Sequence, residues 1–301
     1  MTEITKSIFR EYDIRGIYPI EINEEVIIQI AKAISIKCNS ENVSEICIGR
    51  DGRNSSKSLS YSLEKSLSNF GVDVENIGLV TTPLLYFASK KSKSKSGVMI
   101  TGSHNPKNYN GLKLVINDKP ISGNEIYELI NQNIDESIHP GKISRKDIRD
   151  LYIKEVIENI QIKNGKKLKV VIDCGNGAAG CIAPKLFQEL GCDVIELFTE
   201  IDGNFPNHHP DPSKLENLSD IVNKVKSSKA DLGLAFDGDG DRVGLITDTG
   251  EVVFPDKIMM IFSEDILKKE KGSIIFDVKC TKALPNLIKN LNGKPSMSPT
   301  G

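Results

Sequence analysis

Short apolar runs of strand length alternate with longer amphipathic segments along most of the chain, and this alternation limits the fold more than any other feature. Residues 45–48 and 97–100 are apolar runs typical of buried strands, whereas residues 24–38 carry apolar side chains at helical spacing. Strands that alternate with helices are typical of β-α-β units, in which a helix connects two parallel strands. The sequence therefore predicts an α/β fold of tandem related domains with mixed, mostly parallel sheets.

A strand-like run that ends in an acidic residue occurs three times. The three runs are residues 46–51, 170–173 and 274–277. Recurrence at a spacing of roughly 100 to 125 residues indicates related structural units, because internal repeats keep corresponding strands at a regular period. We therefore expect three α/β units that share a common plan.

The boundaries of these units follow from polar connections and from the density of strand patterns. We expect the first unit at residues 1–148, the second at 149–251 and the third at 252–301. The first boundary follows the polar stretch 139–146, whose Pro and Gly are typical of connecting segments. The third unit has few strand patterns, and a half-built sheet buries too little apolar surface to be stable alone. We therefore expect this unit, and with it the chain, to be incomplete relative to its fold.

Charge and hydropathy limit the partners of the chain. Its 301 residues carry 39 Lys and Arg against 41 Asp and Glu, so a net charge of -2 provides no basic field that attracts nucleic acids. Its apolar runs are shorter than the ~20 residues of a membrane span, and residues 1–10 show no apolar secretion signal. The six cysteines form no Cys-x-x-Cys pair, which favours reduced core thiols over zinc ligands. The sequence predicts a cytoplasmic protein that binds a small molecule, with neither a nucleic acid nor a membrane as partner.

The most specific segment is the run of alternating Asp and Gly at residues 237–242, between two strand-like runs. Alternate spacing in an extended loop directs Asp237, Asp239 and Asp241 toward one point, where a hard cation such as Mg²⁺ would offset their mutual repulsion. An EF-hand is excluded because Arg242 stands at the sixth position, which that motif reserves for glycine. We predict a metal site here rather than a solvated acidic turn.

A second segment, Thr-Gly-Ser-His-Asn-Pro at residues 101–106, follows the strand-like run 97–100. Its Ser103 lies where open α/β sheets bind ligands, and His104 and Lys113 supply charge and protons for a hydroxyl nucleophile. The segment lacks the two flanking glycines of a nucleophile elbow. Taken alone, a serine in such a turn is more often a loop residue than a nucleophile.

A third segment, residues 175–180, fits the G-x-G-x-x-G template of dinucleotide-binding proteins and has Glu196 as its acidic partner. Asp173, however, ends the preceding strand, where its charge opposes a bound pyrophosphate. We therefore predict a tight turn between strand and helix, with dinucleotide binding as the alternative.

Two further segments contain charged groups without a unique interpretation. Residues 9–16 include Tyr12 and Arg15, and arginine there serves either to bind phosphate or to form a structural salt bridge. His208 and His209 look like a metal-binding pair, but the side chains of adjacent residues diverge. We predict that the two histidines belong to a Pro-rich structural loop.

Together these segments make the chain similar to the α-D-phosphohexomutase family, and most of all to its bacterial phosphomannomutase/phosphoglucomutase branch. The matching segments run in order from Phe9 to the end of the chain. They are residues 9–16, 101–106, 109–113, 173–177, 202–212 and 237–242. Members of this family have four α/β domains, so the resemblance implies domains one and two, an incomplete domain three and no domain four.

The resemblance implies that Ser103 is a phosphoserine. It would donate its phosphoryl group to a hexose 1-phosphate or 6-phosphate and regain the other phosphoryl group from a 1,6-bisphosphate intermediate, which also acts as activator. Ser103 and the carboxylates of Asp237, Asp239 and Asp241 would hold Mg²⁺. The chain would then be an isomerase of carbohydrate metabolism that acts by intramolecular phosphoryl transfer, as a monomer or weak oligomer.

The resemblance also assigns roles to the other matching residues. Arg15 and Arg242 would offset transition-state charge, and Lys113 beside His104 would transfer protons. The substrate-binding residues would be Tyr12, Arg15 and Asn110.

Family members continue after Thr-Gly with a histidine, a sugar-recognition loop and a fourth domain, and we expect these parts to be absent here. The choice between mannose and glucose phosphates therefore stays open. Two other functions also stay open, namely a metal-assisted phosphohydrolase and a remnant that is weakly active or inactive.

Overall fold

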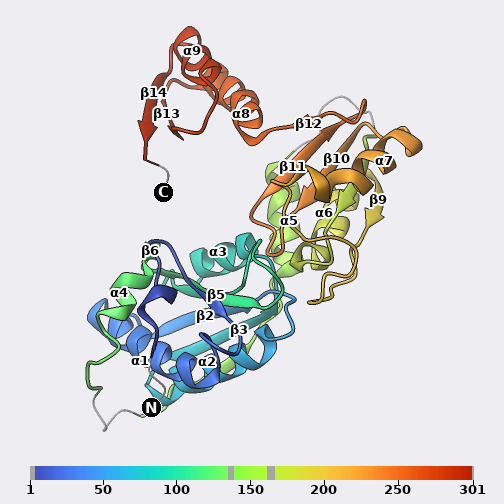
Figure 1. Cartoon of the computed structure of the whole chain (residues 1–301). Coiled ribbons are helices and arrows are strands. Elements are labelled where there is room, and N and C mark those ends of the chain that lie inside the picture. Colours follow the sequence, from blue (N-terminus) through green and yellow to red (C-terminus); the bar gives the residue numbers. More distant parts are fainter. Residues whose placement is uncertain (1–3, 135–138, 161–166, 300–301) are drawn as a thin grey trace.

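The computed structural model describes residues 4–134, 139–160 and 167–299, and these form three consecutive α/β units. Figure 1 shows the first unit in blue to green, the second in yellow to orange, and the third in red beyond the second. The α/β class expected from the alternating pattern is confirmed. In the part of the chain described, none of the helices has the length and apolar character needed to cross a membrane.

The first unit contains a seven-stranded mixed sheet. Its strand order is β1-β5-β4-β2-β3-β7, and β6 pairs with β5 beside this path. Strands β2, β3, β4 and β7 are parallel, and β1, β5 and β6 join through antiparallel pairs. The strands are β1 (Ile14–Ile17), β2 (Glu45–Arg50), β3 (Asp73–Leu79), β4 (Gly97–Ile100), β5 (Tyr109–Ile116), β6 (Lys119–Ile121) and β7 (Ile143–Arg145).

Helices cover both faces of this sheet. Ile46 and Ile48 of β2 pack in one apolar cluster with α1 (Glu24–Ser40) and α2 (Ser56–Asn69). Cys47 lies between them in sequence and packs in a second cluster with α3 (Thr82–Lys91) and α5 (Arg149–Asn159). Successive side chains of a strand point to opposite faces, so this central strand is buried on both sides.

Three sequence patterns of the first unit give an incomplete description of it. The stretch 139–146 is more than a connection, since its residues 143–145 form the edge strand β7. No strand pattern marks the segment 9–16, but its residues 14–16 lie in β1 and pair with β5. The helical pattern of residues 124–133 predicts a helix, and the structure forms only the shorter α4 (Gly123–Tyr127), after which hydrogen bonds between residues three apart close tight turns.

The second unit has a five-stranded sheet in the order β12-β11-β10-β8-β9. Strands β8, β9 and β10 are parallel, and β11 and β12 are antiparallel additions. The elements are β8 (Lys169–Asp173), η2 (Ala178–Cys181), α6 (Ala183–Glu189), β9 (Asp193–Leu197), η3 (Leu215–Leu218), α7 (Ser219–Ser228), β10 (Leu232–Phe236), β11 (Val243–Thr247) and β12 (Val252–Val253). The helical pattern of residues 178–190 predicts one helix, but the structure divides it into η2 and α6, and Pro184, which has no backbone N–H to donate, stands in the first turn of α6.

The third unit contains α8 (Pro255–Lys269), α9 (Ala283–Asn290) and the parallel pair β13 (Ser273–Asp277) and β14 (Lys294–Ser298). Its core consists of Leu267, Phe276, Leu284 and Ile288 with partly buried neighbours. Large apolar side chains, including those of Phe262 and Ile275, are exposed on this unit.

The three units share one local structure, as the repeated strand-plus-acid pattern predicts. Each of the three acids follows or ends a parallel strand, and its Oδ1 accepts the backbone N–H two residues later. The pairs are Asp51 with Arg53 at 3.0 Å, Asp173 with Gly175 at 2.9 Å and Asp277 with Lys279 at 2.8 Å. Such an Asx turn reverses the chain directly after the strand.

Candidate active site

The serine loop, residues 101–108, connects the antiparallel strands β4 and β5. Ser103 is 2% exposed and has a φ of 48°, in the left-handed region that non-glycine residues rarely adopt. Its backbone N–H donates to Thr101 Oγ1 at 2.7 Å. A strained and buried serine requires support from its surroundings, which is typical of functional loops.

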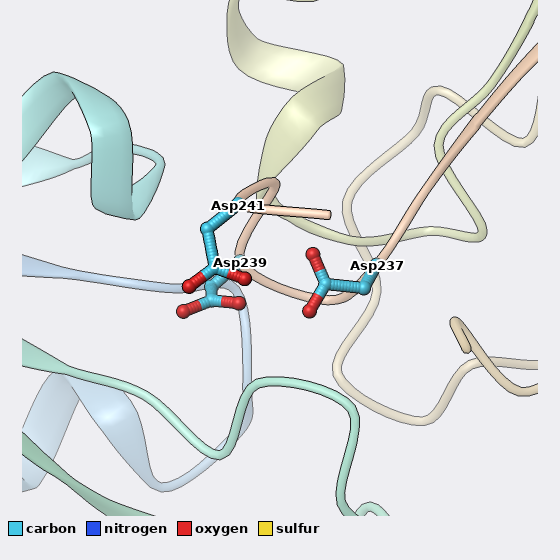
Figure 2. Close-up of side chains that lie close together, drawn as sticks. All are labelled: Asp237, Asp239 and Asp241. Atoms are coloured by element: carbon cyan, nitrogen blue, oxygen red, sulfur yellow. The ribbon is translucent and has the colours of Figure 1, made fainter. Parts of the chain in front are cut away.

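The aspartate loop, residues 237–242, connects β10 and β11 of the second unit. Asp237 and Asp239 are fully buried, and Asp241 is exposed at the rim. One carboxylate oxygen from each residue lies within 4.8 Å of the others. Figure 2 shows the three side chains together on this loop. The loop turns tightly at Gly240, whose φ of 70° favours glycine. The convergence expected from the alternate spacing is therefore present.

The two loops meet although they lie 134 residues apart in sequence. Ser103 Oγ donates to Asp237 Oδ2 at 3.0 Å. A Cβ atom on Gly238 would lie 2.4 Å from the carbonyl oxygen of Ser103, so glycine is needed for this approach. Thr82 holds the aspartate loop from α3, since its N–H donates to the Asp239 carbonyl at 2.9 Å and its Oγ1 to Asp239 Oδ2 at 2.5 Å.

The carboxylates have opposite electrostatic environments. Burial raises the pKa of Asp237 well above its ordinary value, and the negative charges of Asp239 and Asp241 add to the increase. Burial also opposes ionisation of Asp239, but the Lys113 ammonium outweighs it and lowers the pKa of Asp239 to about 2. Lys113 Nζ lies 2.7 Å from Asp239 Oδ2 and also pairs with Asp241. Despite burial, these two carboxylates raise the pKa of Lys113, which keeps it protonated at neutral pH.

The oxygen atoms of this cluster suit a hard divalent cation. Oδ1 of Asp239 is buried and has no hydrogen-bond partner, an expensive arrangement unless a cation or another ligand satisfies it. Three carboxylates at one point also repel one another, and Mg²⁺ is typically bound by carboxylate oxygens. The donor set therefore fits Mg²⁺.

The structure brings most of the other candidate residues to the same place. Arg15 is 3% exposed and donates from Nη1 to the Thr101 carbonyl of the serine loop. His104 Nδ1 lies 3.4 Å from Ser103 Oγ, and burial together with the Arg242 guanidinium lowers the pKa of His104. The Arg242 side chain is half exposed at the rim.

The remaining two candidates differ in their surroundings. Tyr12 is 59% exposed and thus free to meet a ligand. Asn110 is fully buried, and its Nδ2 donates to Ser55 Oγ at 2.8 Å and Ser56 Oγ at 2.9 Å. The role of Asn110 in substrate binding stays a prediction, and in the structure its side chain contacts Ser55 and Ser56 at the start of α2.

In the Gly-rich segment 175–180, which the structure describes in full, the backbone N–H groups of residues 175–178 are not free to bind a pyrophosphate. The N–H groups at its start donate to protein oxygens. Gly175 donates to Asp173 Oδ1, and Asn176 donates to the Phe198 carbonyl. Gly177 donates to the Cys174 carbonyl, and Ala178 donates to the Gly238 carbonyl. The segment is the expected tight turn, and its Ala178 amide supports the aspartate loop.

The two adjacent histidines diverge as expected. His208 Nε2 faces the Asp173 carboxylate at 3.0 Å, and its Nδ1 faces the His209 carbonyl. His209 Nε2 donates to the His104 carbonyl of the serine loop at 2.6 Å. This loop of the second unit is structural, and it contacts the serine loop of the first.

Two residues that hold the site together, Thr82 and Arg53, have no sequence pattern that marks them as part of it. Thr82 follows Thr81, the N-cap of α3, and the sequence signal before Pro83 indicates only the start of a helix. Arg53 follows the acid of the first strand-plus-acid run, where the shared Asx turn is the available signal. Neither signal indicates a contact with the active-site loops.

Fold and site together define an α/β protein in which a serine hydroxyl of one unit faces a cluster of three carboxylates of the next, whose donor set fits Mg²⁺. Models of the phosphoglucomutase/phosphomannomutase alpha/beta/alpha domains I and II match residues 6–138 and 150–250. The chain belongs to the phosphoglucomutase/phosphomannomutase family, which confirms the resemblance.

Individual relatives agree with this assignment. A phosphomannomutase/phosphoglucomutase of Pseudomonas syringae pv. tomato is 50% identical over 98% of this chain and 64% of its own length. A phosphoglucomutase of Neisseria gonorrhoeae is 42% identical over 100% of this chain and 66% of its own length. The crystal structure of a family protein from Burkholderia thailandensis matches with a TM-score of 0.91 and 39% identity, over 99% of this chain and 67% of that one. The chain thus spans about two thirds of the length of these relatives.

Proposed function

We propose that this chain carries the phosphoryl-transfer centre of a phosphomannomutase/phosphoglucomutase, which interconverts hexose 1-phosphate and hexose 6-phosphate. The observation that carries the proposal is the hydrogen bond of 3.0 Å between Ser103 Oγ and Asp237 Oδ2, which joins a strained serine to the carboxylate cluster. The names of the relatives support the substrate class.

Ser103 is the phosphoryl carrier in this proposal. When the enzyme is loaded from a hexose 1,6-bisphosphate, a bond forms between Ser103 Oγ and phosphorus, and the bond between phosphorus and the sugar oxygen breaks. In the catalytic cycle the phosphoserine first transfers its phosphoryl group to the free hydroxyl of the hexose monophosphate, so the Oγ–P bond breaks and a new sugar O–P bond forms. The resulting 1,6-bisphosphate reorients, and its other phosphoryl group returns to Ser103 Oγ as the bond between that phosphorus and its sugar oxygen breaks. The 1,6-bisphosphate is therefore both intermediate and activator.

The neighbouring side chains handle protons and charge. The lowered pKa of His104 leaves its imidazole neutral and able to accept the Ser103 proton from 3.4 Å. As the family resemblance implies, Lys113 is the proposed proton donor to the departing sugar oxygen, and it must leave its ion pairs with Asp239 and Asp241 to act, because these raise its pKa and hold the proton. Arg15 and Arg242 bring positive charge to the serine loop and the rim, where a transferring phosphoryl group needs it.

Asp237, Asp239 and Asp241 would hold Mg²⁺ together with an oxygen at Ser103. A bound Mg²⁺ supplies a Lewis acid and a template for in-line transfer. The chain's own contribution is the buried, unpartnered Oδ1 of Asp239 and the approach of the aspartate loop to the backbone of Ser103.

The test is to incubate the purified chain with Mg²⁺ and glucose 1,6-bisphosphate, measure its intact mass and map the modified residue. We expect one phosphoryl group on Ser103 and none on the Ser103→Ala variant. Label elsewhere, or equal label on the variant, would contradict the assignment. Stoichiometric free phosphate would favour a phosphohydrolase, and an unlabelled wild type would favour a remnant that binds without turnover.

We further propose domain boundaries near residues 148 and 251. The placement of β7 in the first sheet supports the first boundary, and the end of β12 supports the second. Cytoplasmic location, a monomeric or weakly oligomeric state and the absence of nucleic-acid and membrane partners stay predictions.

A further inference from the structure

We infer that Arg53 is a positioning residue that fixes the backbone of the serine loop for phosphoryl transfer, an inference that rests on the proposed function. Arg53 lies in the turn between β2 and α2 and is 2% exposed. Its guanidinium reaches the serine loop from the side of the sheet, and it does not contact the Ser103 hydroxyl in any hydrogen bond of the described chain.

The guanidinium binds four backbone carbonyls in and beside the serine loop. Nη2 donates to Ser103 O at 2.7 Å and to Asn105 O at 2.6 Å. Nη1 donates to Pro106 O at 2.6 Å and to Tyr109 O at 3.0 Å. A planar guanidinium presents its donors in a fixed fork, so these four bonds fix the relative positions of the carbonyls.

Asp51 holds the guanidinium and the loop together. Its Oδ2 lies 3.3 Å from Arg53 Nε and accepts the Gly102 N–H at 3.1 Å. A Cβ atom on Gly102 would lie 2.3 Å from both Cζ and Nε of Arg53, so a side chain there would displace the guanidinium. Glycine before the serine is therefore a requirement of this contact.

The contact matters because Ser103 is held in a conformation that its own backbone disfavours. Its φ of 48° persists only if surrounding contacts favour it over the alternatives. Two of these contacts are made by the backbone of Ser103 itself, whose N–H donates to Thr101 Oγ1 and whose carbonyl accepts from Arg53 Nη2, both at 2.7 Å. Loss of the fork would release Ser103 Oγ from its place beside Asp237.

The second unit covers the guanidinium from the other side. The Phe205 ring centroid lies 5.2 Å from Arg53 Cζ, a cation-π distance. A Cβ atom on Gly52 would lie 2.2 Å from Ile201 Cγ2, which shows how closely the two units pack here. Arg53 therefore links the serine loop to the unit that carries the aspartate loop.

The test compares Arg53→Lys with the wild-type chain by two measurements. The first is the single-turnover rate of Ser103 phosphorylation from glucose 1,6-bisphosphate at saturating Mg²⁺. The second is amide hydrogen exchange in the serine loop, which needs no turnover. Lysine keeps the charge but cannot span four carbonyls, so we expect phosphorylation to slow about 100-fold, the effect of a displacement of about 1 Å. Exchange in the serine loop should rise at least tenfold, while Mg²⁺ affinity and exchange in β2 stay unchanged.

The matched control is Arg149→Lys, the same exchange at an arginine whose side chain pairs with Asp147 on the surface. If Arg53→Lys does not fold, Gly102→Ala decides, since a Cβ atom there would lie 2.3 Å from Cζ and Nε of Arg53 and would displace the guanidinium without removing its charge. That variant should also slow phosphorylation and raise exchange in the serine loop. Wild-type rates and exchange in the folded Lys variant, or in Gly102→Ala, would overturn the inference. An unlabelled wild type with faster loop exchange in Arg53→Lys would instead reject the proposed function and leave the positioning role supported.

Discussion

Replacement of Asp239 by asparagine tests whether the three carboxylates form a metal site. Asp239 Oδ2 accepts hydrogen bonds from Thr82 Oγ1 at 2.5 Å and Lys113 Nζ at 2.7 Å, and Oδ1 is buried without a partner. An asparagine has one acceptor and one donor in these two places. If its oxygen faces Thr82 and Lys113, its NH₂ group occupies the place of the free ligand atom. If it is reversed, its NH₂ group faces two donors.

Either orientation removes a negative charge from the cluster. The three ligand oxygens lie within 4.8 Å of one another, so a cation bound among them would be nearer than that to Asp239. Opposite unit charges at about 4.8 Å attract by about 3.5 kcal/mol at an effective dielectric constant of about 20, which is a lower bound for the attraction between Asp239 and a divalent cation. Since about 1.4 kcal/mol corresponds to a factor of ten in an equilibrium constant, about 3.5 kcal/mol corresponds to a factor of roughly a few hundred in the Kd. We therefore expect the Kd for Mg²⁺ to rise at least about 100-fold in Asp239→Asn.

Isothermal titration of the chain with Mg²⁺ measures this change. The matched control is Asp248→Asn, the same exchange at an exposed aspartate in the turn between β11 and β12. Circular dichroism should confirm that both variants are folded. A folded Asp239→Asn variant whose Kd stays within threefold of the wild-type value would refute the assignment of Asp239 as a ligand.

Two further perturbations test the contacts around the site. Burial disfavours the charged ring of His208, but the bond to Asp173 outweighs it and raises the pKa of His208 above its ordinary value. The pair therefore stabilises the fold below about pH 6.5 and loses this contribution as the pH rises through the raised pKa. The difference in Tm between wild type and His208→Gln should shrink with rising pH, and a difference that grows would contradict the assignment. Gly238→Ala places a Cβ atom 2.4 Å from the Ser103 carbonyl, so we expect a loss of about 1–3 kcal/mol in unfolding free energy and slower Ser103 phosphorylation. Gly272→Ala, with nothing within 4 Å of its Cβ, is the control, and equal melting of the two variants would reject the close approach.

Local sequence signals predicted the elements whose structure is decided locally. The run at residues 97–100 is a strand with those bounds, because apolar residues bounded by polar ones leave few other structures. Strands β1 and β7 were missed because they are short and partly polar. Their pairing partners, β5 and β3, lie far away in sequence. The helical pattern at 178–190 does not show that the segment is divided into η2 and α6, with Pro184 in the first turn of α6.

The candidate site shows the same division between local and long-range information. The spacing of Asp237, Asp239 and Asp241 predicted their convergence, since it depends only on one loop. The place of Ser103 beside Asp237 followed from the family resemblance and not from spacing. No sequence signal linked Arg53 to the serine loop, because its four acceptors are backbone carbonyls 50 to 56 residues away, and a carbonyl has no sequence signature.

The repeated Asx turn explains why a segment that resembles a dinucleotide-binding motif lies so close to this site. In the first unit, the turn at Asp51 presents Arg53 to the serine loop. In the second unit, the turn at Asp173 presents the Ala178 amide to the Gly238 carbonyl of the aspartate loop at 2.9 Å. Both turns lie at the carboxyl end of a parallel strand, where α/β sheets place their functional loops. The glycines of the second turn thus allow close packing against another loop of the protein. A bound pyrophosphate requires the same close approach to the backbone, so a G-x-G pattern occurs both in dinucleotide-binding turns and in structural turns such as this one.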